Sequence, residues 1–372
     1  MTGLAAPDEP CCGPKPGPPS SPYARPGYRL CHFVIDFIET GVGPVPRIET
    51  TLRPRDLAGT VRARTGILRS NYRIAPGLYA AGHPDADGPV LVTANYKLSF
   101  DSLRRELTAV DAWILVLDTR GVNVWCAAGK RTFSTDEVIR QVKRSGLEKV
   151  VRHRELILPQ LAAPGVSARE VKKGCGFKVI WGPIRAGDLQ AFLEKGCRAE
   201  PEMRRITFSV GERIILVPVE LALIVRPTLV ILLGLFLLSG IGPGVFSFST
   251  AWFRGLHGAG AYLLGVLAGA VIVPAMLPWL PSRRFYIKGI FPGLAAGVLT
   301  ILLTDGAVSR LESISLILLA TAVSSYAAMN FTGATPFTSP SGVEKEMRQG
   351  IPLQAVAVAA AAVAWVAAPF AR

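Results

Sequence analysis

Five long apolar runs in the C-terminal half of this 372-residue chain constrain its fold more than any other feature. They occupy residues 227–246, 260–280, 286–303, 313–331 and 353–370. A membrane-spanning helix needs about 20 mostly apolar residues, and each run is close to that length. The stretch 214–225 is shorter and contains Glu220, so we interpret it as an interfacial segment or the start of the first span. The sequence therefore predicts an all-helical membrane domain of about five helices.

Basic residues in the loops between these runs predict the orientation. Five spans put the second and fourth loops on the side of the N-terminal half, and their basic residues are Arg283, Arg284, Lys288, Lys345 and Arg348. The basic residues on the opposite side are Arg254, Arg310 and Arg372. By the positive-inside rule, this predicts a multi-pass protein of the cytoplasmic (inner) membrane whose N-terminal half faces the cytoplasm.

The composition of the spans favours an anchor or scaffold over a transporter. Almost no ionisable residue falls at mid-depth, whereas ion and proton paths usually contain some. Small residues are frequent, and they allow helices in a membrane to pack closely.

The distribution of charged residues suggests the domain limits of the chain, and the spacing of its cysteines argues against one kind of cofactor. We predict a disordered, Pro- and Gly-rich tail at 1–30, a soluble domain at 31–212 and the membrane domain at 213–372, because charged residues recur only up to about Arg213. The tail lacks the apolar core of a secretory signal. The net charge is +14, but the basic residues are scattered, which favours anionic membrane lipid over nucleic acid as a partner. Six cysteines without a CxxC pair argue against an iron–sulfur cluster in this chain.

Strand-like and helix-like segments alternate between residues 89 and 200. The strand-like segments are 89–96, 112–119, 149–159 and 177–184, and the helix-like ones are 99–110, 134–146, 167–173 and 186–196. This alternation predicts a Rossmann-like α/β fold with a mainly parallel sheet. Ligands of such sheets bind beyond the carboxyl ends of the strands, where Thr93 and Asn95 are expected. No phosphate loop or GxGxxG turn is present to favour a nucleotide.

One cysteine falls at such a strand end, in "NVWCAAGK" (123–130). Asn123 can cap a helix whose first three residues are Val124, Trp125 and Cys126. The partial positive charge at a helix N-terminus favours a thiolate, and Lys130, one turn further on, adds to that effect. The pattern predicts a nucleophile or a soft-metal ligand, although a lone cysteine beside Trp and Ala is usually a small core residue.

The three residues after the cysteine, Ala127, Ala128 and Gly129, are all small. A large, flat ligand could therefore lie close to this helix. Two other cysteines, Cys175 and Cys197, stand next to glycine at the ends of helix-like segments and are expected to be incidental. The adjacent Cys11 and Cys12 could hold Hg(II) or could be incidental residues of a solvated tail.

The octet "NVWCAAGK" resembles, at all eight positions, the signature of the HgcA family, the membrane-bound corrinoid proteins of anaerobic mercury methylation. The resemblance extends from about Val90 to Cys197 and to the five spans. The soluble domain also resembles the corrinoid-binding domain of the corrinoid iron–sulfur protein of the acetyl-CoA pathway, through "VLVTANYKLSFDSL", "DAWILVLDTRG" and "HRELILP". After Lys130 the chain departs from the family run, because "RTFST" stands where glycines are expected.

The resemblance implies a cobalamin-type corrinoid with residues 123–130 forming a cap helix over its lower face. Trp125 would lie against the corrin, Thr93 and Asn95 would be further contacts, and Cys126 would be the catalytic residue that ligates cobalt. Its thiolate would ease transfer of a cobalt-bound methyl group to Hg(II), giving methylmercury. The implied partners are a methyltetrahydrofolate-type donor, acting directly or through another methyltransferase, and a low-potential ferredoxin-like electron donor.

Two alternatives remain open. A membrane-anchored corrinoid methyl carrier of one-carbon metabolism could use the cofactor's own base or water below cobalt and would not need Cys126. A non-catalytic membrane sensor or scaffold would bind no corrinoid, and its thiol would have no special role.

Overall fold

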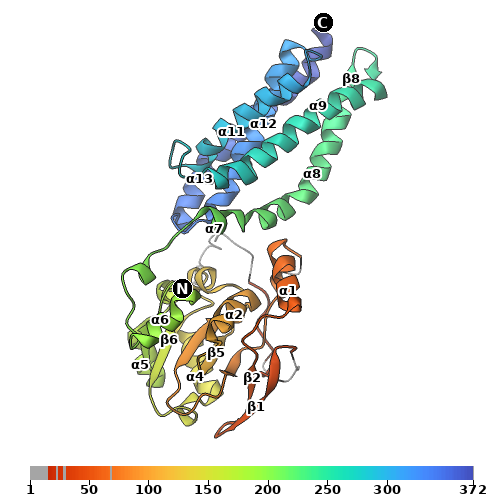
Figure 1. The fold of residues 1–372 in the computed structure, drawn as a ribbon. Coiled ribbons are helices and arrows are strands. Elements are labelled where there is room, and N and C mark those ends of the chain that lie inside the picture. Colours follow the sequence, from red (N-terminus) through yellow and green to blue (C-terminus); the bar gives the residue numbers. More distant parts are fainter. Residues whose placement is uncertain (1–15, 22–23, 28–30, 68, 372) are drawn as a thin grey trace, which may run out of the picture. The chain divides into compact units, whose positions relative to one another are not determined.

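The computed structural model describes residues 16–21, 24–27, 31–67 and 69–371 (Figure 1). Nearly all of this chain belongs to two compact units that divide between Thr207 and Phe208. The domain limits expected from the sequence, 1–30, 31–212 and 213–372, stay predictions. Much of the expected tail, with Cys11 and Cys12, lies outside the described residues, so the Hg(II) hypothesis for that pair stays open.

The first unit is built on a seven-stranded sheet. Its strands are β1 (Val34–Thr40), β2 (Gly43–Ile48), β3 (Gly77–Ala81), β4 (Val90–Ala94), β5 (Ala112–Leu117), β6 (Glu155–Leu158) and β7 (Lys178–Trp181). They lie in the order β1-β2-β3-β5-β4-β6-β7. The four strands β5, β4, β6 and β7 run parallel, whereas β3 is antiparallel to β5 and β1 is antiparallel to β2. The α/β prediction is confirmed, with a mixed sheet.

Six α-helices accompany this sheet: α1 (Pro54–Arg64), α2 (Lys97–Arg104), α3 (Val124–Gly129), α4 (Thr135–Ser145), α5 (Ala168–Cys175) and α6 (Leu189–Glu194). Short 3₁₀ turns connect them: η1 (Arg69–Asn71), η2 (Arg105–Leu107), η3 (Leu147–Lys149), η4 (Gln160–Gly165), η5 (Ala186–Asp188) and η6 (Glu202–Arg204). Predicted helix 99–110 is thus shorter than expected, because α2 tightens into a 3₁₀ turn at Arg105.

Side chains of the central strands alternate between two hydrophobic cores, as the two-residue period of a strand requires. In β5, Trp113, Leu115 and Leu117 join Val138 of α4 and Val171 of α5. The intervening Ala112, Ile114 and Val116 join Phe100 of α2 and Phe192 of α6. The sheet is therefore covered on both faces, with α3, α4 and α5 on one and α2 and α6 on the other.

The predicted strand 149–159 is extended only from Glu155 onward. Residues Leu147–Lys149 form a 3₁₀ turn, and the Arg154 side chain donates to the carbonyl of Val151 at 2.8 Å. The side chain of Arg154 thereby favours a turn over a strand before residue 155.

The second unit is helical. Its elements are α7 (Val210–Ile214), α8 (Val217–Ser239), the hairpin β8 (Ile241–Gly242) and β9 (Val245–Phe246), α9 (Phe248–Leu267), a π-helical segment η7 (Ala268–Ile272), α10 (Val273–Ala275), α11 (Phe285–Leu303), α12 (Arg310–Asn330), η8 (Phe331–Ala334), α13 (Pro340–Ala367) and η9 (Ala368–Phe370). Five helical stretches are long and apolar enough to cross a membrane, judged by length and composition. This supports a membrane protein, and the predicted cytoplasmic orientation stays a prediction.

The first span differs from the predicted run 227–246. Helix α8 includes much of the stretch 214–225, with Glu220 in its first turn, and ends at Ser239. Residues 241–246 form the hairpin instead, since "GIGPG" places a proline and three glycines there.

Small residues bring three of these helices close together. A Cβ added at Gly269 or Gly289 would lie 2.3 or 2.6 Å from the carbonyl oxygen of Ser324 in α12. Only glycine allows backbones to approach in this way, which confirms the predicted role of small residues in packing the bundle.

Candidate functional site

Helix α3 begins as predicted, with Asn123 as its N-cap. The backbone of Asn123 is extended, and its Oδ1 accepts a hydrogen bond from the backbone N–H of Cys126 at 2.8 Å. The carbonyl of Asn123 also accepts from the N–H of Ala127 at 2.8 Å. The cap therefore fixes the backbone of Cys126 in the first turn.

Burial differs around α3. Ala127 and Ala128 are buried in the core. The partly exposed residues of the octet are Asn123, Val124, Trp125, Cys126 and Lys130, and Gly129 is exposed. Val124 and Cys126 also pack partly against the core on the side of α4 and α5. The thiol is therefore neither enclosed in the core nor fully in solvent.

Asn95 holds the loop that leads from β5 into α3. Its Oδ1 accepts from the Thr119 hydroxyl at 2.9 Å and from the Gly121 N–H at 3.0 Å, and its Nδ2 donates to Asp118 at 3.0 Å. The side chain is fully buried. Asn95 therefore lies near the carboxyl ends of β4 and β5, against the loop that leads into α3. Both the oxygen and the nitrogen of its side-chain amide form hydrogen bonds with that loop.

Glu137 of α4 also holds this loop, and the sequence did not point to it. Its Oε1 accepts from the Asp118 N–H at 2.8 Å and from Gln141 Nε2 at 3.0 Å. Burial raises the pKa of the Glu137 carboxyl, although these hydrogen bonds and nearby Arg140 oppose that effect. The spacing of Ser134 and Glu137 signals a helix start, but nothing local indicates the long-range contact with Asp118.

Thr93 is not brought together with α3. It alternates with Val92 and Ala94 of β4, whose side chains share a core with Ala127. Thr93 therefore points to the opposite face, that of α2, and is 4% exposed. Its predicted contact with a cofactor stays a prediction.

The chain leaves α3 through a tight turn. The N–H groups of Thr132 and Phe133 both donate to the carbonyl of Ala127, at 2.9 and 3.0 Å. Arg131 lies in the left-handed region, with φ of 59°, which glycine adopts more easily. An arginine at this position therefore costs backbone strain, and the turn forms nevertheless.

The back of α3 is tightly packed. A Cβ on Gly165 of η4 would lie 2.3 Å from the carbonyl oxygen of Phe133 and 3.0 Å from the Cα of Ala128. Backbone-to-backbone approach of this kind requires the small residues found there. This close contact accounts for the small size of Ala128, and the contact of Ala127 and Ala128 with a flat ligand stays a prediction.

Two described residues of the expected tail reach the same loop. The Gly17 N–H donates to the carbonyl of Arg120 at 2.9 Å, and the Ser20 N–H donates to Asp118 Oδ2 at 2.7 Å. The loop before α3 is therefore contacted by the N-terminal segment as well as by β4 and α4.

Cys175 and Cys197 lie in other surroundings. The Cys175 thiol donates to the carbonyl of Val171 at 3.2 Å, within α5. Burial raises the pKa of the thiols of both Cys175 and Cys197, which disfavours the reactive thiolate. Their expected incidental role stays a prediction.

Comparison with known proteins gives matches to part of the chain. Residues 67–193 match the family described as CO dehydrogenase/acetyl-CoA synthase delta subunit (CdhD). The gamma subunits of the acetyl-CoA decarbonylase/synthase complex from Archaeoglobus fulgidus and Methanopyrus kandleri are each 33% identical over 129 residues, which is 34% of this chain and 27% and 28% of those proteins. The gamma subunit from Methanothermobacter thermautotrophicus is 33% identical over 131 residues, 34% of this chain and 28% of that protein.

The chain thus spans about a quarter of the length of the curated relatives it matches. The family match runs from before β3 to α6 and includes α3 and Asn95. The part of the sheet unit from residue 67 to residue 193 is therefore similar to part of these complex subunits.

Proposed function

We propose that the sheet unit binds a cobalamin-type corrinoid and that the chain is a membrane-held methyl carrier. One observation carries the proposal: Cys126 stands half-buried in the first turn of a capped helix, at the carboxyl edge of the sheet, inside the region matched by the CdhD family. The relatives named as acetyl-CoA decarbonylase/synthase subunits and the corrinoid-protein resemblance of the octet support the same cofactor.

The residues around α3 fit such a cofactor. Cysteine sulfur is a soft ligand suited to a transition metal, and the exposure of Cys126 leaves it within reach of one. Gly129 presents no side chain, and Trp125 offers an aromatic surface that can lie against a flat ring system. Asn123, Val124 and Lys130 complete the partly exposed surface of the helix.

The bound corrinoid would supply a cobalt atom that carries the methyl group. Cys126 would be the lower ligand of that cobalt. Asn123 would keep the cysteine backbone in place through its cap, while Asn95 and Asp118 would keep the preceding loop in place. The protein thereby sets the position of the sulfur before the cofactor binds, which lowers the ordering cost of ligation.

The names of the relatives favour one-carbon metabolism as the setting, since all belong to a complex that makes or breaks acetyl-CoA. The methyl donor would be of the methyltetrahydrofolate type, acting directly or through another methyltransferase. A low-potential ferredoxin-like protein would return cobalt to its reduced state. The five spans would hold the sheet unit at the cytoplasmic side of the inner membrane.

Hg(II) is a second candidate acceptor, favoured by the octet at 123–130 and by the accessible thiol. Cys126 would hold the cobalt through its thiolate, and the bound cofactor would supply a methyl group suited to a soft electrophile such as Hg(II). In this reading the product is methylmercury and Cys126 is the catalytic residue.

The cofactor and its ligand can be tested on the purified full-length chain under anoxic conditions, with added cobalamin. Cys126→Ala is compared with Cys175→Ala, which removes another partly buried helical thiol. We expect all three proteins to bind cobalamin, with a thiolate-ligated optical spectrum in the wild type and in Cys175→Ala only. Identical spectra in all three would reject Cys126 as the ligand, and no binding in any would reject the corrinoid.

The acceptor is tested by loading the same proteins with methylcobalamin and adding Hg(II). If Hg(II) is the acceptor, mass spectrometry will detect methylmercury above the background of protein-free methylcobalamin, and Cys126→Ala will lower the yield at least tenfold. A wild-type yield of methylmercury equal to the background would reject Hg(II) as the acceptor and leave the methyl carrier of one-carbon metabolism.

A further inference from the structure

Helix α1 is oriented against the usual rule for amphipathic helices. Its residues Asp56 and Ala63 are each 1% exposed and pack into the sheet unit. Leu57 and Val61, one turn apart on the other side, are 54% and 61% exposed. A surface helix normally turns its apolar stripe to the core and its charge to water, so α1 buries an aspartate and exposes a leucine and a valine.

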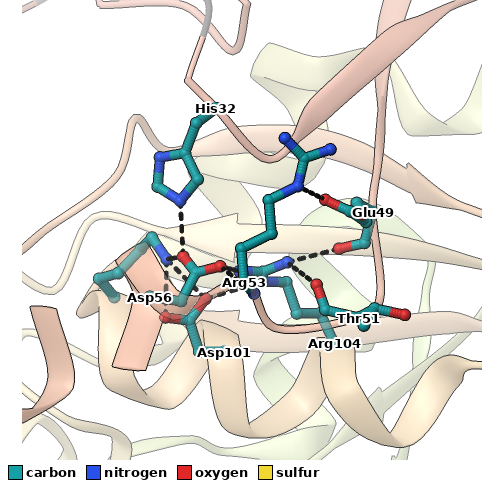
Figure 2. Close-up of polar contacts among 8 residues, drawn as sticks. His32, Glu49, Thr51, Arg53, Asp56, Asp101 and Arg104 are labelled. Carbon is teal, nitrogen blue, oxygen red and sulfur yellow. Dashed lines mark hydrogen bonds and ion pairs between the residues drawn. The ribbon is translucent and has the colours of Figure 1, made fainter. Parts of the chain in front are cut away.

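A cluster of mostly buried ionisable side chains explains how Asp56 can face inward. We call it the charge cluster: His32, Asp56, Lys97, Asp101 and Arg104 (Figure 2). His32 Nε2 and Lys97 Nζ each lie 2.7 Å from Asp56 Oδ1, and Arg104 Nη2 lies 2.8 Å from Asp56 Oδ2. A buried carboxylate with this many partners is tolerated, whereas an unpaired one is not.

The charge cluster is itself anchored in α2. Lys97 Nζ is 2.7 Å from both carboxylate oxygens of Asp101, and Arg104 Nε is 2.7 Å from Asp101 Oδ1. Arg104 is fully buried and also donates to the carbonyl of Glu49 at 2.5 Å, a contact visible in Figure 2. The orientation of α1 is therefore set by ionic contacts with α2 and not by its own apolar residues.

Asp56 stays ionised over the physiological pH range. Burial alone would raise the pKa of its carboxyl, but the hydrogen bonds from Lys97 and His32 outweigh burial and hold that pKa well below its usual value. Asp56 Oδ2 also accepts from the Arg53 N–H at 3.1 Å, at the start of α1. Both the start and the rotation of the helix thus depend on this side chain.

The outward face of α1 combines apolar and positively charged side chains. Ile67, just beyond the helix in the chain, is a further exposed apolar residue, at 55%. Arg55 and Arg62 are exposed beside them, and Asp56 is the only acidic residue between 54 and 67. Single exposed apolar residues are ordinary, but three of them bordered by arginines form the pattern of a helix that lies in a membrane interface.

We propose that α1 is a membrane-surface helix whose Leu57, Val61 and Ile67 enter the headgroup boundary of an anionic bilayer. Two observations select lipid as the occupant. The five apolar helices of this chain support its residence at a bilayer. The exposed arginines carry the positive charge that anionic headgroups attract.

The same unit provides a matched control surface. Ile35 of β1 is 54% exposed, almost the same as Leu57, but it stands next to Asp36 and close to Glu39. An apolar residue with acidic neighbours lacks attraction to an anionic bilayer. The proposal therefore predicts lipid contact at position 61 and not at position 35, and it does not depend on the corrinoid.

The test uses the full-length chain in lipid nanodiscs, with the photo-crosslinking residue p-benzoylphenylalanine placed at Val61 or at Ile35. One set of discs contains phosphatidylcholine and the other contains phosphatidylcholine with phosphatidylglycerol. We expect lipid adducts at position 61 in the anionic discs, several-fold more than in the neutral discs and than at position 35. Arg55→Glu with Arg62→Glu should lower the adduct yield at position 61 several-fold.

Three results would overturn the proposal. The first is crosslinking of position 61 to protein, either to residues 208–372 or to a second copy of the chain. The second is the absence of any adduct. The third is a yield of lipid adducts that is the same in neutral and anionic discs. Hydrogen exchange of α1 in the same discs shows whether each variant keeps the helix, so loss of the helix is not mistaken for loss of lipid contact.

Discussion

Helices α1 and α3 of the sheet unit differ in what they bury: α3 turns the small apolar residues Ala127 and Ala128 into the core, whereas α1 buries Asp56. Helix α3 is also held by hydrogen bonds, through the cap of Asn123 and the contacts of Asn95 and Glu137 with the loop before it. Helix α1 is held by ionic contacts of Asp56 with Lys97 and Arg104. Both helices carry partly or largely exposed side chains, and we assign a ligand to each: a corrinoid to Cys126 and a lipid surface to Leu57 and Val61.

The largest effect should come from Asp56→Asn. Asparagine has nearly the same volume but leaves the buried cations Lys97 and Arg104 with less negative charge. Breaking a buried pair in this way costs about 3–5 kcal/mol. Hydrogen exchange of the full-length chain should show a loss of this size in the opening free energy of α1.

The matched control is Asp36→Asn, which breaks the more exposed pair of Asp36 with Arg47. Surface pairs contribute about 0–1 kcal/mol, so this variant should change exchange very little. Equal effects of the two changes would contradict the different anchoring that we assign to α1.

A pH titration also tests whether ionised Asp56 stabilises α1. The pKa of Asp56 is lowered by folding, so its contribution to stability is complete above the ordinary aspartate value of about 4 and is lost as pH falls below it. We expect the opening free energy of α1 to decrease from about pH 5 to pH 3 in the wild type. In Asp56→Asn this decrease should be smaller, and an unchanged slope would assign the acid sensitivity to other groups.

A smaller effect is expected from Asn95→Ala, which loosens the loop before α3. The variant leaves the buried Gly121 N–H and the Thr119 hydroxyl without their acceptor on Asn95, at a cost of about 2 kcal/mol. Exchange should increase in residues 118–126 and not in α1. Thr93→Val, in β4 two residues before Asn95, serves as the control and should leave the loop protected.

The smallest effect, and a stabilising one, is expected from Arg131→Gly. Left-handed backbone costs a non-glycine residue about 1–2 kcal/mol, while the greater freedom of glycine in the unfolded chain costs about 0.5–1 kcal/mol. The net gain should be about 0.5 kcal/mol in the exchange of the turn after α3. A loss of stability would show that the Arg131 side chain supports the turn.

Local signals predicted the parts of the fold where one stretch of sequence suffices. The apolar run of β5 and the Asn123 cap of α3 were both predicted from such local signals. The first three strands were not predicted. Pro44 and Pro46 interrupt β2, and β3 consists of Gly, Leu, Tyr and two Ala, so both have weak strand propensity and depend on pairing with distant strands.

For the candidate site as well, only the features encoded in one short stretch of sequence were predicted. The octet located α3 and its thiol, but the loop contacts of Asn95 and Glu137 required the fold. The charge cluster shows the same limit. Lys97, Asp101 and Arg104 share a helix face by their spacing, yet such a face is usually solvated, and Asp56 lies 41 residues before Lys97 in the chain.

The central claim is that the sulfur of Cys126 is a ligand of cobalt. X-ray absorption at the cobalt edge, measured on the full-length chain loaded with cobalamin under anoxic conditions, tests it most directly. We predict one sulfur neighbour of cobalt in the wild type and in Cys175→Ala, and none in Cys126→Ala. A cobalt shell that contains only nitrogen and oxygen in the loaded wild-type protein would contradict the claim.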